Sequence, residues 1–116
     1  MIKNLWKNTT FYCGHGHEMP IEMYYKDGPL SMFYACPKYY PENRTENERA
    51  CSNRLNFVDA EAIIEKFSAI IEEKEADNTF FDFTNFSFKY RSIEVKVVEY
   101  SLDSVKLQII NRKALK

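Results

Sequence analysis

The chain has 116 residues, of which 45% are hydrophobic and 28% charged, and its formal net charge at pH 7 is -1. This composition is typical of a soluble folded protein with one compact domain or two very small ones. A net charge near zero excludes a protein that binds polyanions over its whole surface. The sequence lacks the run of roughly 18 apolar residues that a membrane helix needs, and residues 1–10 lack the apolar core of a signal peptide. We therefore expect a cytoplasmic protein without a membrane partner.

Residues 1–10 are predicted to form an N-terminal extension, and Thr9 to Tyr12 a short strand that leads into a group of candidate metal ligands. All three cysteines and both histidines of the chain lie in residues 13–51. Because an isolated cysteine or histidine is usually an ordinary core or surface residue, it is their concentration in one stretch that predicts a metal site. A disulfide framework would leave one cysteine unpaired, and no secretory segment supports it.

Zinc prefers four ligands drawn from thiolate and imidazole, and a structural site uses all four positions. The first ligand pair is expected to be Cys13 with His17 or His15, and the second is expected to be Cys36 with Cys51. The pattern thus predicts one structural zinc in a zinc ribbon.

Two glycines and a hairpin would bring these two pairs together. Gly14 and Gly16 allow a sharp turn within the first pair. Residues 19–34 alternate in polarity on both sides of a turn sequence at residues 26–29, which predicts a β-hairpin. This hairpin would return Cys36 to a position beside the first pair.

Catalysis is not expected from these residues. A zinc with four protein ligands has no open position for water or substrate. Glu18 follows His17, as in zinc deaminases, but the Pro-Cys-x-x-Cys pair of that signature is absent. The sequence also lacks a phosphate-binding glycine loop and a nucleophile-elbow serine. We therefore expect a non-enzymatic protein without a small-molecule substrate.

Residues 32–41, MFYACPKYYP, resemble the second half of the zinc-ribbon repeats at the C-terminus of bacterial type IA DNA topoisomerases. Gly28 and the Met19–Pro20 step fit the same repeats, so the resemblance covers about residues 11–55. It implies a ribbon fold, a structural zinc and contact with single-stranded DNA. Carried over by position, it implies four ligands: Cys13, His17, Cys36 and Cys51. Small zinc-ribbon proteins of phages and mobile elements look similar.

The chain departs from these repeats in both ligand pairs. The first pair contains a histidine and three intervening residues, where the family usually has two cysteines two apart. This difference leaves open whether His15 or His17 is the ligand. We favour His17, because three intervening residues give more room than one to close the turn. Fourteen residues separate Cys36 from Cys51, far more than usual, and could occupy a DNA-binding face.

Residues 37–50 read as a loop in which positive and negative charges cancel. Tyr39 and Tyr40 could stack on nucleic-acid bases, or one could pack over the metal site while the other is solvated. Arg54 adds a positive charge nearby. The tyrosines and Arg54 are therefore one group of candidate nucleic-acid-binding residues.

Residues 59–77 predict an amphipathic helix with Asp59 as its N-cap, and Val58 and Ile63 stand at the positions of a hydrophobic staple. Apolar residues recur at helical spacing and form one stripe, composed of Ala60, Ile63, Ile64, Phe67, Ile70 and Ile71. The opposite face is acidic, as expected for a helix face that is exposed to solvent.

Residues 86–109 alternate in polarity in three segments with a turn at residues 101–104, which predicts antiparallel strands packed under the helix. The segment from residue 86 to residue 116 carries a charge of about +4, and basic residues interleaved with aromatic ones are typical of single-strand binding surfaces. A second group of candidate nucleic-acid-binding residues follows: Lys89, Arg91 and Lys96. Three further aromatic residues could line a partner groove: Phe80, Phe81 and Phe83.

The predicted fold class is α+β. A small zinc ribbon of β-hairpins around one metal precedes one amphipathic helix and a C-terminal antiparallel β-hairpin or three-stranded sheet. The predicted units are the extension 1–10, the ribbon 11–57 and the helix with its strands 58–116, with the last two packed together. The expected function is weak binding of nucleic acid, and the favoured ligand is single-stranded DNA. The alternative is a protein–protein adaptor, of phage or mobile-element origin.

Overall fold

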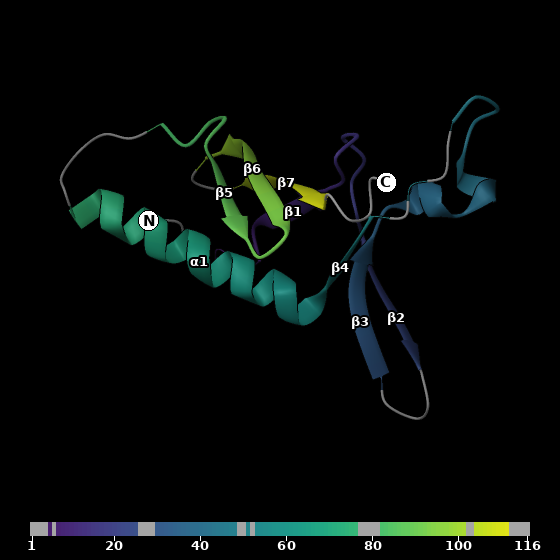
Figure 1. Ribbon diagram of the computed structural model, residues 1–116, viewed down its shortest axis with the longest axis horizontal. Coiled ribbons are helices and arrows are strands. Elements are labelled where there is room, and N and C mark those ends of the chain that lie inside the picture. Colours follow the sequence, from purple (N-terminus) through teal and green to yellow (C-terminus); the bar gives the residue numbers. More distant parts are fainter. Residues whose placement is uncertain are drawn as a thin grey trace.

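The computed structural model describes residues 5, 7–25, 30–48, 51, 53–76, 82–101 and 104–111. The fold is α+β, as predicted, with one α-helix and two β-sheets (Figure 1). The four-stranded sheet has the order β1-β7-β6-β5, with β1 Thr9–Tyr12, β5 Ser87–Tyr90, β6 Ile93–Tyr100 and β7 Val105–Asn111. The three-stranded sheet has the order β2-β3-β4, with β2 Ile21–Tyr25, β3 Leu30–Ala35 and β4 Arg54–Asn56. Helix α1 spans Phe57–Ala76, and two short 3-10 helices, η1 Pro37–Tyr39 and η2 Pro41–Asn43, follow β3.

The four-stranded sheet contains the predicted antiparallel strands and one strand more. Strand β6 pairs antiparallel with β5 and with β7, and its register shifts between Val97 and Glu99, where the alternation of the sequence changes phase. Strand β1 joins the other edge of β7 in parallel, with Thr9 opposite Val105. The sequence analysis did not predict this partner, because a four-residue strand carries no information about its register. Whether the predicted boundary at residue 11 divides the chain stays a prediction, although β1 runs across it.

The hydrophobic core lies between α1 and one face of the four-stranded sheet. Alternate residues in the first part of β6 and in β7 are buried there: Ile93, Val95, Val97, Val105, Leu107 and Ile109. Phe67 of α1 is fully buried and stacks on the ring of Phe88, with ring centroids 5.6 Å apart. Figure 1 shows α1 running along this side of the strands. The residues that alternate along the strands and the residues that recur at helical spacing thus pack against each other in one core.

The apolar stripe of α1 is confirmed, but the start of the helix differs from the prediction. Helix α1 begins at Phe57, directly after β4, so Asp59 lies in its first turn and is not the N-cap. Val58 is 73% exposed and therefore makes no hydrophobic staple with Ile63. The reason is that β4 runs into the helix without a loop, which leaves no room for a separate cap. Residue 77 lies outside the described residues.

Phe83, which was expected to line a partner groove, belongs to the core instead. Its side chain is buried and lies edge-on to Phe67 at a centroid distance of 5.6 Å. Its ring also contacts the rings of Phe86 and Tyr100, at centroid distances of 5.9 Å and 4.9 Å. Phe80 and Phe81 lie outside the described residues.

The predicted hairpin is present as β2 and β3, which pair antiparallel from Ile21 with Tyr34 to Tyr25 with Leu30. Its turn at residues 26–29 lies outside the described residues. Strand β4 adds to the other edge of β3, with Tyr34 opposite Leu55. None of the helices in the described part of the chain has the length and apolar character needed to cross a membrane.

Candidate metal centre

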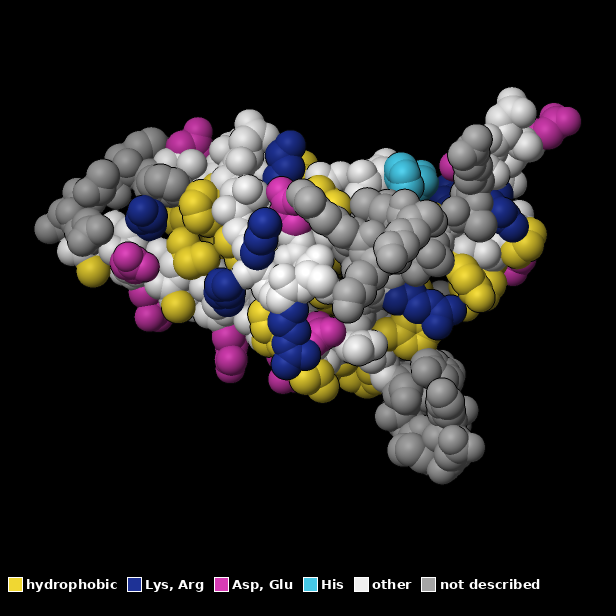
Figure 2. All heavy atoms as spheres, in the orientation of Figure 1, with side chains coloured by type: hydrophobic (Ala, Val, Ile, Leu, Met, Phe, Trp, Pro, Cys, Tyr) yellow, Lys and Arg dark blue, Asp and Glu magenta, His cyan; other side chains and the backbone are white. Residues whose placement is uncertain are grey.

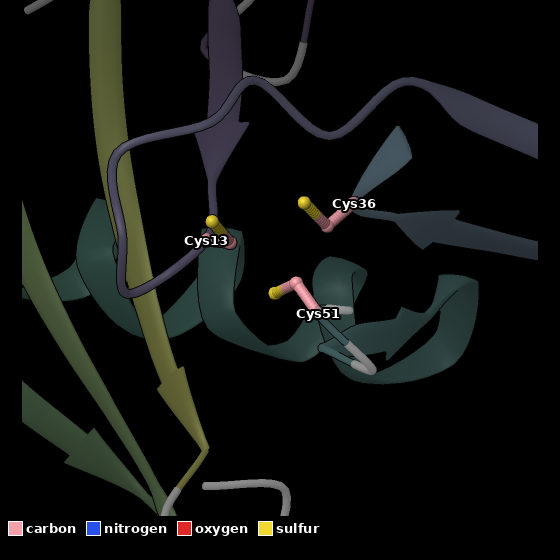
Figure 3. Close-up of side chains that lie close together, drawn as sticks. All are labelled: Cys13, Cys36 and Cys51. Atoms are coloured by element: carbon pink, nitrogen blue, oxygen red, sulfur yellow. The ribbon is translucent and has the colours of Figure 1, made fainter. Parts of the chain in front are cut away.

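The three cysteines come from three separate segments and meet at one point. Cys13 directly follows β1, Cys36 directly follows β3, and Cys51 lies shortly before β4. All three are buried free thiols, and their Sγ atoms all lie within 4.8 Å of one another. Figure 3 shows the three sulfur atoms turned toward a common centre. A tetrahedral zinc with Zn–S bonds of about 2.3 Å holds its sulfurs about 3.8 Å apart, so this cluster has the size that a metal site requires.

Residues 13–17, which we call the metal loop, fold around the first sulfur. The backbone N–H of Gly16 donates to the carbonyl of Cys13, and the N–H of Cys13 donates to the carbonyl of His17 at 2.8 Å. Gly16 has a φ of 87°, a conformation that costs glycine little. The backbone N–H groups of His15 and His17 both point to Cys13 Sγ at 3.3 Å.

The structure places His17 beside the cysteines and His15 away from them. His17 Nδ1 lies 3.3 Å from Cys13 Sγ and 3.5 Å from Cys36 Sγ. Zinc bonds of about 2.3 Å to sulfur and about 2.0–2.1 Å to nitrogen imply an S···N edge of about 3.6 Å. The His15 side chain is exposed, and its ring centroid lies 6.4 Å from that of His17. Of the two histidines, His17 is therefore the one with a ring nitrogen close to two of the three sulfurs, although it is not among the ligand atoms that all lie within 4.8 Å of one another.

The other nitrogen of His17 faces a carboxylate that the sequence analysis did not single out. His17 Nε2 lies 3.7 Å from Glu48 Oε2, and Glu48 Oε1 accepts a hydrogen bond from Lys38 Nζ at 3.0 Å. The Thr45 backbone N–H, which also donates to this carboxylate, and the Lys38 ammonium lower the pKa of Glu48 to about 2. Glu48 is thus ionised at neutral pH and can fix the orientation of the imidazole. A carboxylate on the outer nitrogen is the usual partner of a metal-binding histidine.

The pKa of Cys36 bears on the kind of ligand that the cluster can hold. Burial raises the pKa of Cys36 to about 12, and the neighbouring sulfurs of Cys13 and Cys51 add to the effect. Three buried thiolates repel one another, so the ionised form needs a positive charge at the centre. A divalent cation supplies that charge, and the chemistry of the donor set therefore fits a thiolate-binding metal.

The candidate nucleic-acid-binding residues fall on both sheets. At the three-stranded sheet, the Arg54 guanidinium carbon lies 4.8 Å from the ring centroid of Tyr39 and 5.0 Å from that of Phe33. Tyr39 is 43% exposed and meets the half-buried Tyr40 edge-on. The structure thus brings Arg54 and both tyrosines together.

The other three candidates belong to the four-stranded sheet. Lys89 is exposed on β5, Arg91 is exposed in the turn that follows it, and Lys96 is half-buried on β6. Arg91 lies over the ring of Tyr90, at 5.4 Å from its centroid. These three cations therefore form a group separate from that of Arg54.

A comparison of the chain with protein-family models found no match, and neither did comparisons with curated proteins or with solved structures. The resemblance to topoisomerase zinc ribbons therefore stays a prediction from residues 11–55. What the site offers by itself is a buried cluster of three cysteines that could hold a metal ion.

Proposed function

We propose that this chain is a non-enzymatic zinc-binding protein in which Cys13, His17, Cys36 and Cys51 hold one structural zinc. The observation that carries the proposal is the position of His17, whose Nδ1 approaches two of the three clustered sulfurs while its Nε2 faces the Glu48 carboxylate. Zinc combines thiolate and imidazole ligands in this ratio. Four protein ligands would leave no open position, which makes the metal structural and not catalytic.

The zinc would connect the two sheets of the fold. Cys13 ends β1 of the four-stranded sheet, whereas Cys36 and Cys51 flank β3 and β4 of the three-stranded sheet. One hydrogen bond nearby makes a similar connection, from Asn53 Nδ2 to the carbonyl of Ile109 at 2.8 Å. Within the three-stranded sheet, the side chains described as buried and apolar are Phe33, Ala35 and Leu55, and Leu55 belongs to the main core cluster. A metal held between the two sheets would add its binding free energy to these contacts.

Binding of single-stranded nucleic acid is the second part of the proposal. The exposed ring of Tyr39 beside the Arg54 guanidinium is a stacking surface of the kind that single strands use. Figure 2 shows Lys and Arg spread across the face in view with Asp and Glu among them, and several Asp and Glu along the lower edge, where Figure 1 shows α1. A strand would avoid that acidic edge. The alternative is an adaptor that binds a protein through the acidic face of α1.

Metal analysis of matched histidine variants tests the zinc site. We expect one zinc per chain in protein purified without chelator, and an affinity loss of more than about 100-fold in His17→Ala, because removing only an outer partner of a ligand costs about 10–100-fold. His15→Ala should keep its zinc. His17→Cys should also retain zinc, because four thiolates form an accepted ligand set. Metal-free protein that folds normally, or zinc retained by His17→Ala and lost by His15→Ala, would contradict the assignment.

A further inference from the structure

The face of the four-stranded sheet opposite α1 contains a cavity of about 330 Å³. Side chains alternate along a strand, so the residues between the buried positions of β6 and β7 point away from the core. Among them are three half-buried residues that line the cavity: Lys96, Lys106 and Gln108. Tyr12 of β1, Gly16, Asn85 and Val98 complete the lining. We call this cavity the sheet groove.

The metal loop forms one wall of the sheet groove. Gln108 Nε2 donates hydrogen bonds to the carbonyls of Cys13 at 3.3 Å and Gly14 at 3.1 Å, which fixes the loop against β7. Tyr12, the residue before Cys13, pairs in register with Gln108. A Cβ added to Gly16 would meet nothing within 4 Å, so the loop leaves the space beside it open. The groove and the metal loop therefore share Gly16, and Gln108 both lines the groove and contacts the loop.

The chemistry of the sheet groove is cationic with one aromatic ring. Two lysines from neighbouring strands line it, and none of the described lining residues carries a carboxylate. Lys106 does approach Glu99 at 3.8 Å, but both side chains are partly exposed, and such a pair is weak in water. The groove therefore offers positive charge beside a tyrosine ring, which suits a ligand that is anionic at one end and planar at the other.

We propose that the sheet groove binds one nucleotide of a single-stranded nucleic acid, with the phosphate between Lys96 and Lys106 and the base on the ring of Tyr12. This inference rests on the nucleic-acid part of the proposed function and assigns it a site that the Tyr39 surface does not include. The volume lies at the lower end of the range for small-ligand pockets, so the groove would hold one nucleotide and not several. An unstacked base of a single strand can enter a concave site on the protein, whereas a protein contacts the bases of a duplex with an element that protrudes into a groove.

Fluorescence anisotropy with the zinc-loaded full chain tests this site. The probe is a labelled oligothymidylate of about 12 nucleotides, within the site sizes of single-strand binding domains. Tyr12→Leu removes the stacking ring and should weaken binding about five- to 100-fold at every salt concentration, since one stack is worth about 1–3 kcal/mol and 1.4 kcal/mol is tenfold. Tyr12→Phe, which keeps the ring, should bind as the unaltered protein does.

Lys96→Gln and Lys106→Gln should each reduce the slope of log affinity against log salt by about 0.7–1. The matched control is Lys66→Gln, because Lys66 is exposed on α1 and carries the same charge. Its removal should leave the slope unchanged. Equal zinc content in all variants shows that the metal loop is intact.

The outcomes separate the groove from the broader proposal. If the unaltered protein does not bind the oligonucleotide at low salt, both the nucleic-acid function and the sheet groove are wrong. If it binds, and the groove variants bind equally well while Tyr39→Ala does not, the groove assignment is wrong and the nucleic-acid function stands. Losses confined to Tyr12→Leu, Lys96→Gln and Lys106→Gln support the groove.

Discussion

Replacing Glu48 by glutamine tests whether the carboxylate beside His17 supports metal binding. The substitution keeps the size of the side chain and an oxygen for the Thr45 N–H, but it removes the negative charge that faces His17 Nε2 and Lys38 Nζ. Outer partners of metal-binding histidines contribute about 10–100-fold to affinity. The 3.7 Å separation from His17 Nε2 is longer than a good hydrogen bond. We therefore expect the lower end of that range, a loss of zinc affinity of about tenfold.

Competition with a chromogenic chelator measures this loss directly. The matched control is Glu46→Gln, since Glu46 is an exposed acid of the same loop and its replacement changes the net charge equally. Glu46→Gln should retain the affinity of the unaltered protein. Equal zinc affinities of the Glu48 and Glu46 variants, whether unchanged or equally reduced, would refute the role of the Glu48 carboxylate. An equal reduction would show that both residues act only through the overall charge.

Two further predictions concern stability. Removing zinc with a chelator should raise amide hydrogen exchange in β3 and β4 before it does so in β6 and β7. The reason is that β3 and β4 flank metal ligands, whereas β6 and β7 lie in the core under α1. Simultaneous exchange in all four strands would contradict this order. Phe67→Ala, at a fully buried position against Phe83 and Phe88, should lower the free energy of unfolding by about 3–5 kcal/mol in urea titrations. Val58→Ala, at a position 73% exposed, should change it by no more than about 0.5 kcal/mol; equal effects of the two would show that the core is misplaced.

The sequence was most informative where a pattern is local. Alternation located β5, β6 and β7, the change of phase coincided with the irregularity at Val97 and Glu99, and helical spacing located the buried stripe of α1. The start of α1 was misplaced because Asp59 is a good capping residue whose role depends on whether a loop precedes it. Here β4 enters the helix directly, so the local signal had no effect.

The parts that could not be predicted depend on pairs of residues far apart in the chain. The clustering of the cysteines was visible in the sequence, but the carboxylate partner of His17 was not, since Glu48 lies 31 positions away in a loop whose charges cancel. The sheet groove was likewise hidden, because Tyr12 joins Lys96 and Lys106 only through the pairing of β1 with β7. No periodicity within a four-residue strand specifies such a partner.

The parallel pairing of β1 with β7 has a consequence for how the chain assembles during synthesis. Among the described strands β1 is synthesised first, but its described neighbour in the sheet, β7, is synthesised last. At a translation rate of about 5–20 residues per second, the roughly 90 residues between them take roughly 5–20 s to make. All three cysteines are synthesised within that interval, while β1 still has no partner strand. The pairing that holds Cys13 at the end of the four-stranded sheet therefore forms only after all three cysteines have been made.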